Sequence, residues 1–267
     1  MANLYYREDL GAAAFVVDAI VAVTGDEARH ALRVSRLRVG ERILIGNGSG
    51  ALGEGEVIAA DRDRFSVRLD EVRAEPPALR PLGLVQALAK GDRDERAVEQ
   101  ATEFGVDLIV PWQAERSVSR WDGAGGAEKA TKGVAKWQRI AREASKQSLR
   151  ARVPGIVGPL TLAGLCDWAR AGAQVLVLHP SGELALSEYV RSEAFLQPSE
   201  ADADAAEGDP INGAFLVVGP EGGLSDRELE ALEAAGAVIL RLGETVLRTS
   251  SAGPAALAVL NVALGRW

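Results

Sequence analysis

The stretch that decides the fold runs from residue 215 to 228 and reads Phe215-Leu216-Val217-Val218-Gly219-Pro220-Glu221-Gly222-Gly223-Leu224-Ser225-Asp226-Arg227-Glu228. Its apolar start predicts a buried strand, and Ser225 with Glu228 has the pattern of a capping box that begins a helix. Glycines in the turn between them let the backbone approach a ligand closely, and Pro220 stiffens that turn. The stretch therefore predicts a strand and a helix, joined either by a ligand-binding loop or by a plain tight turn.

Strands and helices alternate on both sides of this unit. We expect strands at 82–89, 108–111, 175–178 and 238–240, and helices at 93–104, 127–149 and 251–264. Such alternation predicts an α/β domain with a parallel sheet over residues 75–267, and places ligands outside the carboxyl ends of the strands.

Residues 1–74 have strand character instead. Short runs rich in β-branched residues at 14–20, 42–45, 55–60 and 64–69 are separated by turns, with one helical segment at 26–37. The pattern predicts a small β-barrel that ends at Glu75-Pro76-Pro77. Residues 48–53 match the dinucleotide motif GxGxxG, but a strand follows them rather than a helix, so a hairpin turn is expected there.

Composition excludes several classes of protein. The chain has 267 residues, of which 47% are hydrophobic and 25% charged, as expected for a folded globular protein. Its apolar runs are far shorter than the roughly 20 residues of a membrane-spanning helix. A single cysteine, Cys166, and two histidines offer neither a disulfide nor a cluster of metal ligands. We therefore expect a cytoplasmic protein without a metal and without a membrane partner.

Charge is distributed unevenly along the chain. Residues 183–209 carry eight acidic residues and one base, which accounts for most of the net charge of −8. The part from 198 to 212 is expected to be a solvated surface loop. The chain also has two basic stretches, 29–42 and 129–152. Helical spacing would gather the bases of the second stretch on one face. Two such stretches favour binding to the phosphates of a nucleic acid.

Three loops follow predicted strands and should meet at one edge of the sheet. They are Leu178-His179-Pro180, Gly219-Pro220-Glu221-Gly222-Gly223 and the segment from Leu242 to Ala252. Backbone groups and apolar side chains would line the crevice between them, a surface suited to a flat heterocycle. No P-loop lysine or nucleophile elbow occurs in the chain, so neither nucleoside triphosphate chemistry nor triad hydrolysis is indicated.

The order of short segments carries a resemblance to a known family. Lys90-Gly91-Asp92-Arg93 and Glu115-Arg116-Ser117 precede the three loops, of which the last contains Leu242-Gly243-Glu244-Thr245-Val246-Leu247-Arg248-Thr249. This combination resembles the RsmE-type ribosomal RNA uridine-N3 methyltransferases of the SPOUT superfamily, nearly from end to end. Residues 30–41 are similar to that family's PUA-like RNA-binding module. The chain departs from the family at Ser250 and Ser251, where Glu and Thr are usual, and at Lys146, where Glu is common.

The resemblance implies a fold, a cofactor and partners. The fold is an α/β domain with a SPOUT-type parallel sheet and a deep trefoil knot, preceded by a small PUA-like β-barrel. The family uses S-adenosylmethionine (SAM), forms homodimers and acts on the 16S ribosomal RNA of the small subunit; DNA is not expected as a partner. The cofactor-binding residues carried over are Leu178, His179, Pro180, Gly219, Pro220, Gly222, Gly223, Leu242, Gly243, Val246, Leu247 and Ser250.

Methylation of uridine at N3 requires loss of a proton and stabilisation of the anion that remains. The permanent charge and planar fork of arginine suit the second task, so Arg116 and Arg248 are the candidates. Glu221 is the candidate proton acceptor or orienting carboxylate. The residues expected to bind RNA are Arg29, His30, Arg33, Arg36, Arg38, Lys136, Arg139 and Arg150. For His30 the alternative is a structural role, in which it caps an element or fills a position in the fold.

Two alternatives stay open at this point. A ribosome-assembly or RNA-binding protein could retain the fold without catalysis, and the departure at Ser250 motivates that reading. A nucleotide-phosphate enzyme using the loop 219–223 would bind ATP or GTP tightly. The apolar residues Leu257, Val259, Leu260 and Leu264 of the last helix could form a dimer face or pack inside the molecule.

Overall fold

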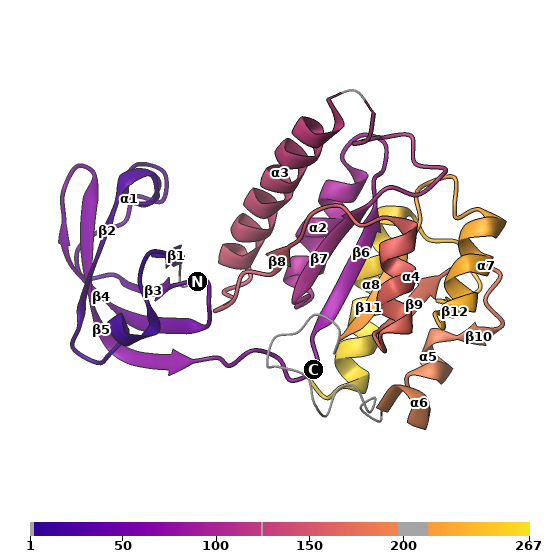
Figure 1. The fold of residues 1–267 in the computed structure, drawn as a ribbon. Coiled ribbons are helices and arrows are strands. Elements are labelled where there is room, and N and C mark those ends of the chain that lie inside the picture. The colour runs from indigo at the N-terminus through magenta and orange to yellow at the C-terminus, as the bar shows by residue number, and fades with distance from the viewer. Residues whose placement is uncertain (1–2, 124, 197–212) are drawn as a thin grey trace. The chain divides into compact units, whose positions relative to one another are not determined.

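The computed structural model describes residues 3–123, 125–196 and 213–267 (Figure 1). The chain divides into two compact units. Unit 1 comprises Met1–Pro77 with Arg142–Val153, and unit 2 comprises Ala78–Ala141 with Pro154–Trp267. The acidic stretch expected at 198–212 lies outside the described residues.

Unit 1 is built on a five-stranded sheet. Its elements are β1 (Leu4–Tyr6), a 3-10 turn (Ala12–Ala14), β2 (Ile20–Thr24), α1 (Gly25–Arg33), β3 (Arg42–Gly46), β4 (Ala51–Ala60) and β5 (Arg64–Ala74). The strand order is β1-β3-β4-β5-β2, and only β1 and β3 pair in parallel. The sheet is half a barrel, because its two end strands do not pair with each other. Apolar side chains of the strands and of α1 form its core, among them Val23, Ala31, Ile45 and Phe65.

The strand expected at 14–20 is wrong. Val16 and Val17 are more than half exposed, and β2 begins only at Ile20. Between them Asp18 has a φ of 67°, in the left-handed region, and its N–H donates to the carbonyl of Leu69 at 2.8 Å. The β-branched pair therefore has strand propensity but no partner strand, because Asp18 turns the chain before pairing can begin.

The GxGxxG segment forms a hairpin turn, as expected. Gly48 and Gly50 have φ values of 70° and 107°, which glycine adopts at little cost. The side-chain oxygen of Asn47 accepts hydrogen bonds from the N–H groups of Ser49 and Ala51 at 2.9 and 3.0 Å. The turn joins β3 to β4, so this motif binds no dinucleotide in the Rossmann manner.

Unit 2 is a three-layer α/β domain. Its elements are β6 (Leu82–Ala87), α2 (Arg93–Glu103), β7 (Leu108–Trp112), α3 (Gly126–Gln147, whose end belongs to unit 1), β8 (Gly155–Ile156), α4 (Leu162–Arg170), β9 (Gln174–Leu178), β10 (Leu184–Ala185), α5 (Leu186–Tyr189), α6 (Glu193–Leu196), β11 (Ala214–Val218), α7 (Asp226–Ala234), β12 (Val238–Arg241) and α8 (Thr249–Ala263). The strands run in the order β10-β12-β9-β11-β6-β7-β8, and all pairs are parallel.

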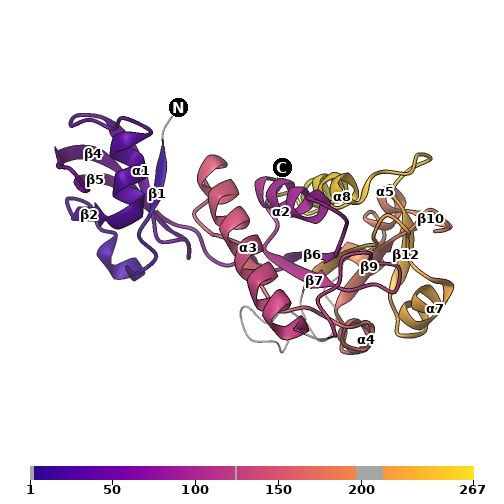
Figure 2. The ribbon, with the colours of Figure 1, turned by 90° about the horizontal axis from the view of Figure 1, so that it is seen from above.

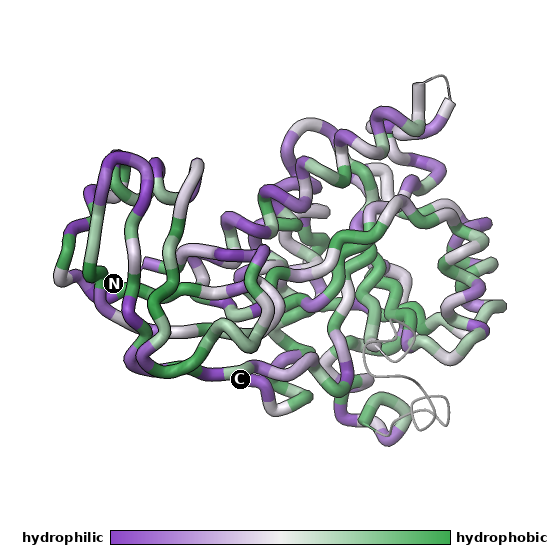
Figure 3. Tube along the Cα trace, turned by 60° about the vertical axis from the view of Figure 1, so that its left-hand side comes forward, coloured by the Kyte–Doolittle hydropathy of each residue, from purple (hydrophilic) through white to green (hydrophobic). Residues whose placement is uncertain are grey.

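Alternate strand residues fill two cores. On one face, Leu84 and Leu216 pack with apolar residues of α2, α3 and α8. On the other, Val85 and Val217 pack with residues of α4 and α7 (Figure 2). The central strands are therefore apolar on both sides, as the green colour along them shows in Figure 3.

Helix α8 crosses from the edge of the sheet to its middle. The chain leaves β12, passes through residues 242–248 and enters α8, which packs against α2, β6 and β11. Leu257 and Leu260 are fully buried there, so they belong to the core and not to a dimer face. The expected fold class is confirmed in its architecture: an α/β domain with a parallel sheet, preceded by a small β-domain whose sheet is a half-barrel. Within the described ranges, no helix meets the length and hydropathy needed to span a bilayer.

Candidate functional site

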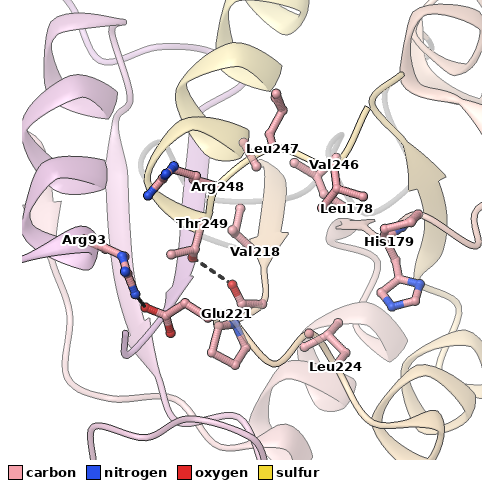
Figure 4. A pocket seen from close by; sticks show the side chains of 15 residues that line it. Arg93, Leu178, His179, Val218, Glu221, Leu224, Val246, Leu247, Arg248 and Thr249 are labelled. Atoms are coloured by element: carbon pink, nitrogen blue, oxygen red, sulfur yellow. Dashed lines mark hydrogen bonds and ion pairs between the residues drawn. The ribbon is translucent and has the colours of Figure 1, made fainter. Parts of the chain in front are cut away.

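The three predicted loops meet over the carboxyl ends of β9, β11 and β12. Together with Arg93 and the first turn of α8 they line a cavity of about 590 Å³ (Figure 4). A second hollow of about 170 Å³ adjoins it and shares Leu178, His179 and Leu247. This position, at the carboxyl edge of a parallel sheet, is where α/β proteins bind ligands.

Most predicted cofactor residues line these hollows. The larger cavity is lined by Leu178, His179, Pro180, Gly219, Pro220, Gly223, Val246 and Leu247, and also by the predicted catalytic residues Glu221 and Arg248. Leu242 and Gly243 line the smaller one. Three predicted residues line neither: Gly222, Ser250 and Arg116. Ser250 is buried in the first turn of α8, so the departure from the family at this position lies outside the cavity wall.

Three elements hold the loop 219–223 in place. The Thr249 hydroxyl, at the start of α8, donates to the carbonyl of Gly219 at 2.8 Å. The carboxylate of Glu221 accepts from the N–H of Lys90 at 3.1 Å and from the guanidinium of Arg93. Arg116 donates from Nη1 to the carbonyls of Gly222 and Leu224 at 3.2 and 2.9 Å. The loop is therefore fixed by contacts from the ends of β6 and β7 as well as from α8.

The environment of Glu221 favours its ionised form. Partial burial would raise the pKa of this carboxyl, but the hydrogen bond from Arg93 and the backbone N–H of Lys90 outweigh burial, so its pKa lies below the ordinary value. A carboxylate with a lowered pKa is a weak base. The geometry thus suits Glu221 better to orienting a ligand and the loop than to accepting a proton.

His179 is held in its neutral form. Burial lowers the pKa of the ring below 6.5, and the charge of Arg116 lowers it further, whereas Asp226 acts in the opposite direction. Nδ1 lies 2.7 Å from the Ser181 hydroxyl, and the N–H of Ser181 points to it at 3.3 Å. His179 therefore adds a polar, uncharged edge to the apolar side of the cavity.

The charged and apolar groups are separated within the cavity. Arg93, Glu221 and Arg248 lie on one side in Figure 4, and Leu178 and Val246 on the other. Arg248 is exposed and forms no ion pair with any residue that the structure describes, so its charge is available to a ligand. The apolar side suits a flat heterocycle, and the charged side suits an amino-acid group with its ammonium and carboxylate. The cavity volume lies within the range of roughly 300–1,000 Å³ typical of ligand sites. The residues present therefore fit a ligand that joins a nucleoside to an amino acid.

Sequence reasoning missed several residues of the cavity wall. Arg93, Val218 and Leu224 line it but were not expected to, whereas Thr249 and Ala252 belong to the segment 242–252 that was expected at the crevice but were not named as cofactor-binding residues. A signal existed for Arg93, because it follows the predicted strand 82–89 and so starts a helix at the same edge of the sheet. Thr249 lies in the predicted loop segment, but its side chain was not singled out, because the last helix was expected to begin at 251 and not at Thr249.

The predicted RNA-binding arginines of unit 1 differ in their pairing. Arg29 forms an ion pair with Asp26. Arg33, Arg36 and Arg38 are exposed and have no ion-pair partner within the described ranges, and His30 is exposed beside them. On the sheet of unit 1, by contrast, Arg42 and Arg68 are neutralised by the acidic residues Glu54, Glu56 and Asp70. Positive charge available to a ligand therefore lies around α1, and also on β5 at Arg64 and Arg73, which are exposed and have no ion-pair partner within the described ranges.

The bases of α3 do not form one solvated stripe. Lys136 pairs with Glu95, and Arg139 is exposed. Lys146 is only 8% exposed and pairs with Glu27 and Glu143 at 3.1 and 3.3 Å. The helix ends at Gln147, so Arg150 lies beyond it, where its backbone carbonyl accepts from the Tyr6 hydroxyl. The expectation of a single basic face is wrong at its C-terminal end, because that end packs into unit 1.

Comparison with known proteins adds independent findings. Residues 75–261 match the RNA methyltransferase domain family, and residues 23–70 match the RNA methyltransferase PUA domain family. The chain is 42% identical, over 93% of its length and 88% of the relative, to the ribosomal RNA small subunit methyltransferase E of Mycobacterium bovis. It is 28% identical to the protein of the same name from Bacillus subtilis, over 90% of its own length and 89% of the relative. A putative methyltransferase from Legionella pneumophila, solved with bound SAM, is 25% identical and superposes with a TM-score of 0.76 over 98% of both chains.

Proposed function

The chain belongs to the RNA methyltransferase family, and from that premise we propose that it transfers a methyl group from SAM to N3 of a uridine in the 16S RNA of the small ribosomal subunit. The observation that carries the proposal is the cavity over the carboxyl ends of β9, β11 and β12, with an apolar side and a charged side. Its place of action is the cytoplasm, where ribosomal RNA is modified.

Residues of all three loops would hold the cofactor. Leu178, Val246 and Leu247 offer an apolar surface to its adenine, and Glu221 and Arg93 offer opposite charges to its ammonium and carboxylate. When bound, SAM supplies an activated methyl group on a sulfonium centre. The glycines at 219 and 223 keep the backbone close to the cavity, with Gly223 at a φ of 69° that only glycine adopts easily.

The chain's own residues have to prepare N3 for methylation. The N3–H of uridine has a pKa about two units above neutrality, so the reactive species is the anion. Arg248, exposed and unpaired within the described ranges, can stabilise the negative uracil oxygen as N3 gives its proton to water. Glu221 is assigned the orienting role. Arg116 is assigned a positioning role, because its guanidinium binds the carbonyls of Gly222 and Leu224.

The small domain, residues 1–74, is proposed to bind the RNA backbone. Arg33, Arg36 and Arg38 supply charge that no acidic residue of the described ranges neutralises. Contacts of this kind position the RNA without reading its sequence. Residues 75–267 form the methyltransferase domain.

A homodimer is part of the proposal. The outer side of α8 and the neighbouring α5 and α6 leave an apolar hollow of about 590 Å³, lined by Val190, Leu196, Val259 and Val262 among others. Val262 is 64% exposed and Leu196 50%, which is a high exposure for apolar side chains. Light scattering during size-exclusion chromatography measures the mass in solution, and a monomer at micromolar concentration would contradict this part.

The test of the function has two stages. Calorimetric titration with SAM and S-adenosylhomocysteine should show binding, whereas ATP should not bind. Methyl transfer to small subunits is then followed with radiolabelled cofactor, and nucleoside mass spectrometry against a 3-methyluridine standard identifies the methylated atom. RNA binding without cofactor binding would favour the non-catalytic alternative, and tight ATP binding would favour a nucleotide-phosphate enzyme.

A further inference from the structure

Gln86 is a polar residue in an otherwise apolar strand. It lies in β6 (Leu82–Ala87), where every residue is buried, and its own side chain is 0% exposed. Burying an amide without hydrogen bonds costs stability, so a glutamine at this place needs a reason. Its oxygen Oε1 has no partner within the described part of the chain, so the reason must lie with the nitrogen.

The nitrogen of Gln86 begins a chain of hydrogen bonds that ends at the cavity. Nε2 donates one hydrogen to the carbonyl of Ala87 at 3.1 Å and the other to Oγ1 of Thr249 at 2.9 Å, and Oγ1 donates to the carbonyl of Gly219 at 2.8 Å. Figure 4 shows the second of these bonds. Gln86 and Thr249 are 163 positions apart in the sequence, and together they reach the loop that follows β11.

The direction of the chain is fixed by chemistry. An amide nitrogen donates only, so the hydroxyl of Thr249 must act as its acceptor. The single hydrogen of that hydroxyl is then left for Gly219. Gln86 therefore determines not only where the hydroxyl lies but also which way it points.

The carbonyl of Gly219 is a sensitive point of the loop. The preceding carbonyl, of Val218, is held by the indole N–H of Trp112 at 3.2 Å, and the following residue, Pro220, has no N–H with which to anchor the turn. The bond from Thr249 is thus the contact that sets the peptide between Gly219 and Pro220. Both of these residues line the cavity.

We propose that Gln86 is a positioning residue of the cofactor site, which acts through Thr249 on the carbonyl of Gly219. The inference rests on the proposed function for the identity of the ligand, SAM. The coupling between Gln86 and the loop is a property of the protein without ligand.

Two pairs of variants separate positioning from packing. Thr249→Val keeps the shape but removes the hydroxyl, whereas Thr249→Ser keeps the hydroxyl. Gln86→Glu replaces the donor by an acceptor that draws the hydrogen of Thr249 away from Gly219, whereas Gln86→Met removes the donor and leaves the Thr249 hydroxyl free to rotate. Thr102→Val is a matched control, because the Thr102 hydroxyl is also buried but bonds the carbonyl of Val98 in its own helix.

Calorimetry with SAM and amide hydrogen exchange of the ligand-free protein are the readouts. We expect Thr249→Val and Gln86→Glu to weaken SAM binding by about tenfold, the effect of one lost hydrogen bond of the stronger kind, and to speed exchange in residues 215–224. Gln86→Met, which only removes the donor, should weaken SAM binding by about fivefold, whereas Thr249→Ser and Thr102→Val should stay within about threefold of the parent protein.

Each outcome has a separate meaning. If the parent protein does not bind SAM, the proposed function fails, and the exchange rates still decide the coupling. If the parent binds SAM but Thr249→Val and Gln86→Glu bind it equally well with unchanged exchange, the positioning role is overturned. Should Gln86→Glu fail to fold, as judged by its melting transition, the comparison of Thr249→Val with Thr249→Ser decides the matter.

Discussion

Arg116 and Gly222 are in direct contact in two ways. Nη1 of Arg116 donates to the carbonyl of Gly222 at 3.2 Å, and its Cβ lies 3.1 Å from the place that a Cβ on Gly222 would occupy. Gly222 does not line the cavity. Its lack of a side chain therefore serves the packing of the loop against residue 116, and not the approach of a ligand.

Replacing Gly222 should disturb the cofactor site indirectly. The side chain in Gly222→Val would push against Arg116, displace the loop and abolish detectable SAM binding in calorimetry. Gly158→Val is the matched control, since nothing lies within 4 Å of a Cβ at that position and the residue lines neither hollow. Normal affinity in Gly222→Val would show that the loop is not part of the site.

Arg33, at the end of α1, and Arg36, just after it, are exposed and have no ion-pair partner within the described ranges. We expect them to contact the RNA. Arg33→Gln with Arg36→Gln should weaken RNA binding and lower the slope of log affinity against log salt by about one for each lost phosphate contact. SAM affinity should not change. Arg42→Gln with Arg68→Gln removes the same charge from residues that already have acidic partners. An equal loss of RNA affinity in both double variants would contradict the assignment.

The pKa of His179 offers a test by NMR. The chain has two histidines, so a His30→Gln variant assigns the signals. We expect the midpoint for His179 below 6.5, because burial disfavours the charged ring. Arg116→Gln should raise this midpoint, since it removes a positive neighbour, and Asp226→Asn should lower it.

The same shift has a consequence for stability. The folded-state pKa of His179 is lowered, so the unfolded state binds the proton more readily. The contribution of His179 to stability is complete above pH 6.5 and declines as the pH falls from there to the folded-state pKa. The unfolding free energies of the parent and of His179→Gln, measured by urea titration, should therefore change differently with pH only in that window.

Glu221 is expected to orient and not to accept the proton. Glu221→Gln keeps an oxygen for the N–H of Lys90 but weakens the bond with Arg93. Because the Arg93–Glu221 pair is partly exposed, its loss should cost about 1 kcal/mol or less, or roughly fivefold in kcat/KM for SAM. The pH profile of kcat should keep its shape. A profile that loses its acidic limb in this variant would identify Glu221 as the base.

Lys146 is expected to stabilise unit 1 through Glu27. Lys146→Glu places a carboxylate against Glu27 and Glu143 and should cost about 3 kcal/mol of unfolding free energy, because the pair is largely buried. Exchanging the charges in the double variant Lys146→Glu, Glu27→Lys should restore most of it. Lys132→Glu, on an exposed pair with Glu128, should cost less than about 1 kcal/mol. Equal costs at 146 and 132 would argue against the buried pair.

The sequence was sufficient where structure depends on neighbouring residues. The capping box is an example: the Ser225 hydroxyl accepts from the N–H of Glu228 at 3.2 Å, and the Glu228 carboxylate accepts from the N–H of Ser225 at 2.8 Å. The buried strands and the hairpin at 48–50 were likewise predicted. Each depends on a run of a few residues whose preferences agree. The helix at 162–170 was missed, although Thr161 caps it.

Other features follow only from contacts distant in sequence. Asp18 ends a strand-like run because its N–H meets Leu69, and Lys146 leaves the solvated stripe because α3 ends against Glu27.

The candidate site, too, could be predicted from the sequence only in part. The sequence by itself determined that three loops would meet at one edge of a parallel sheet, because the alternation of strands and helices fixes that edge. Only the tertiary structure decided which side chains enter the cavity: it placed Arg93 and Thr249 in the wall and turned Arg116 toward the carbonyls of the loop. The physical reason is that a hydrogen bond depends on distance and direction in space, and the folded chain alone brings Gln86, Thr249 and Gly219 within reach of one another.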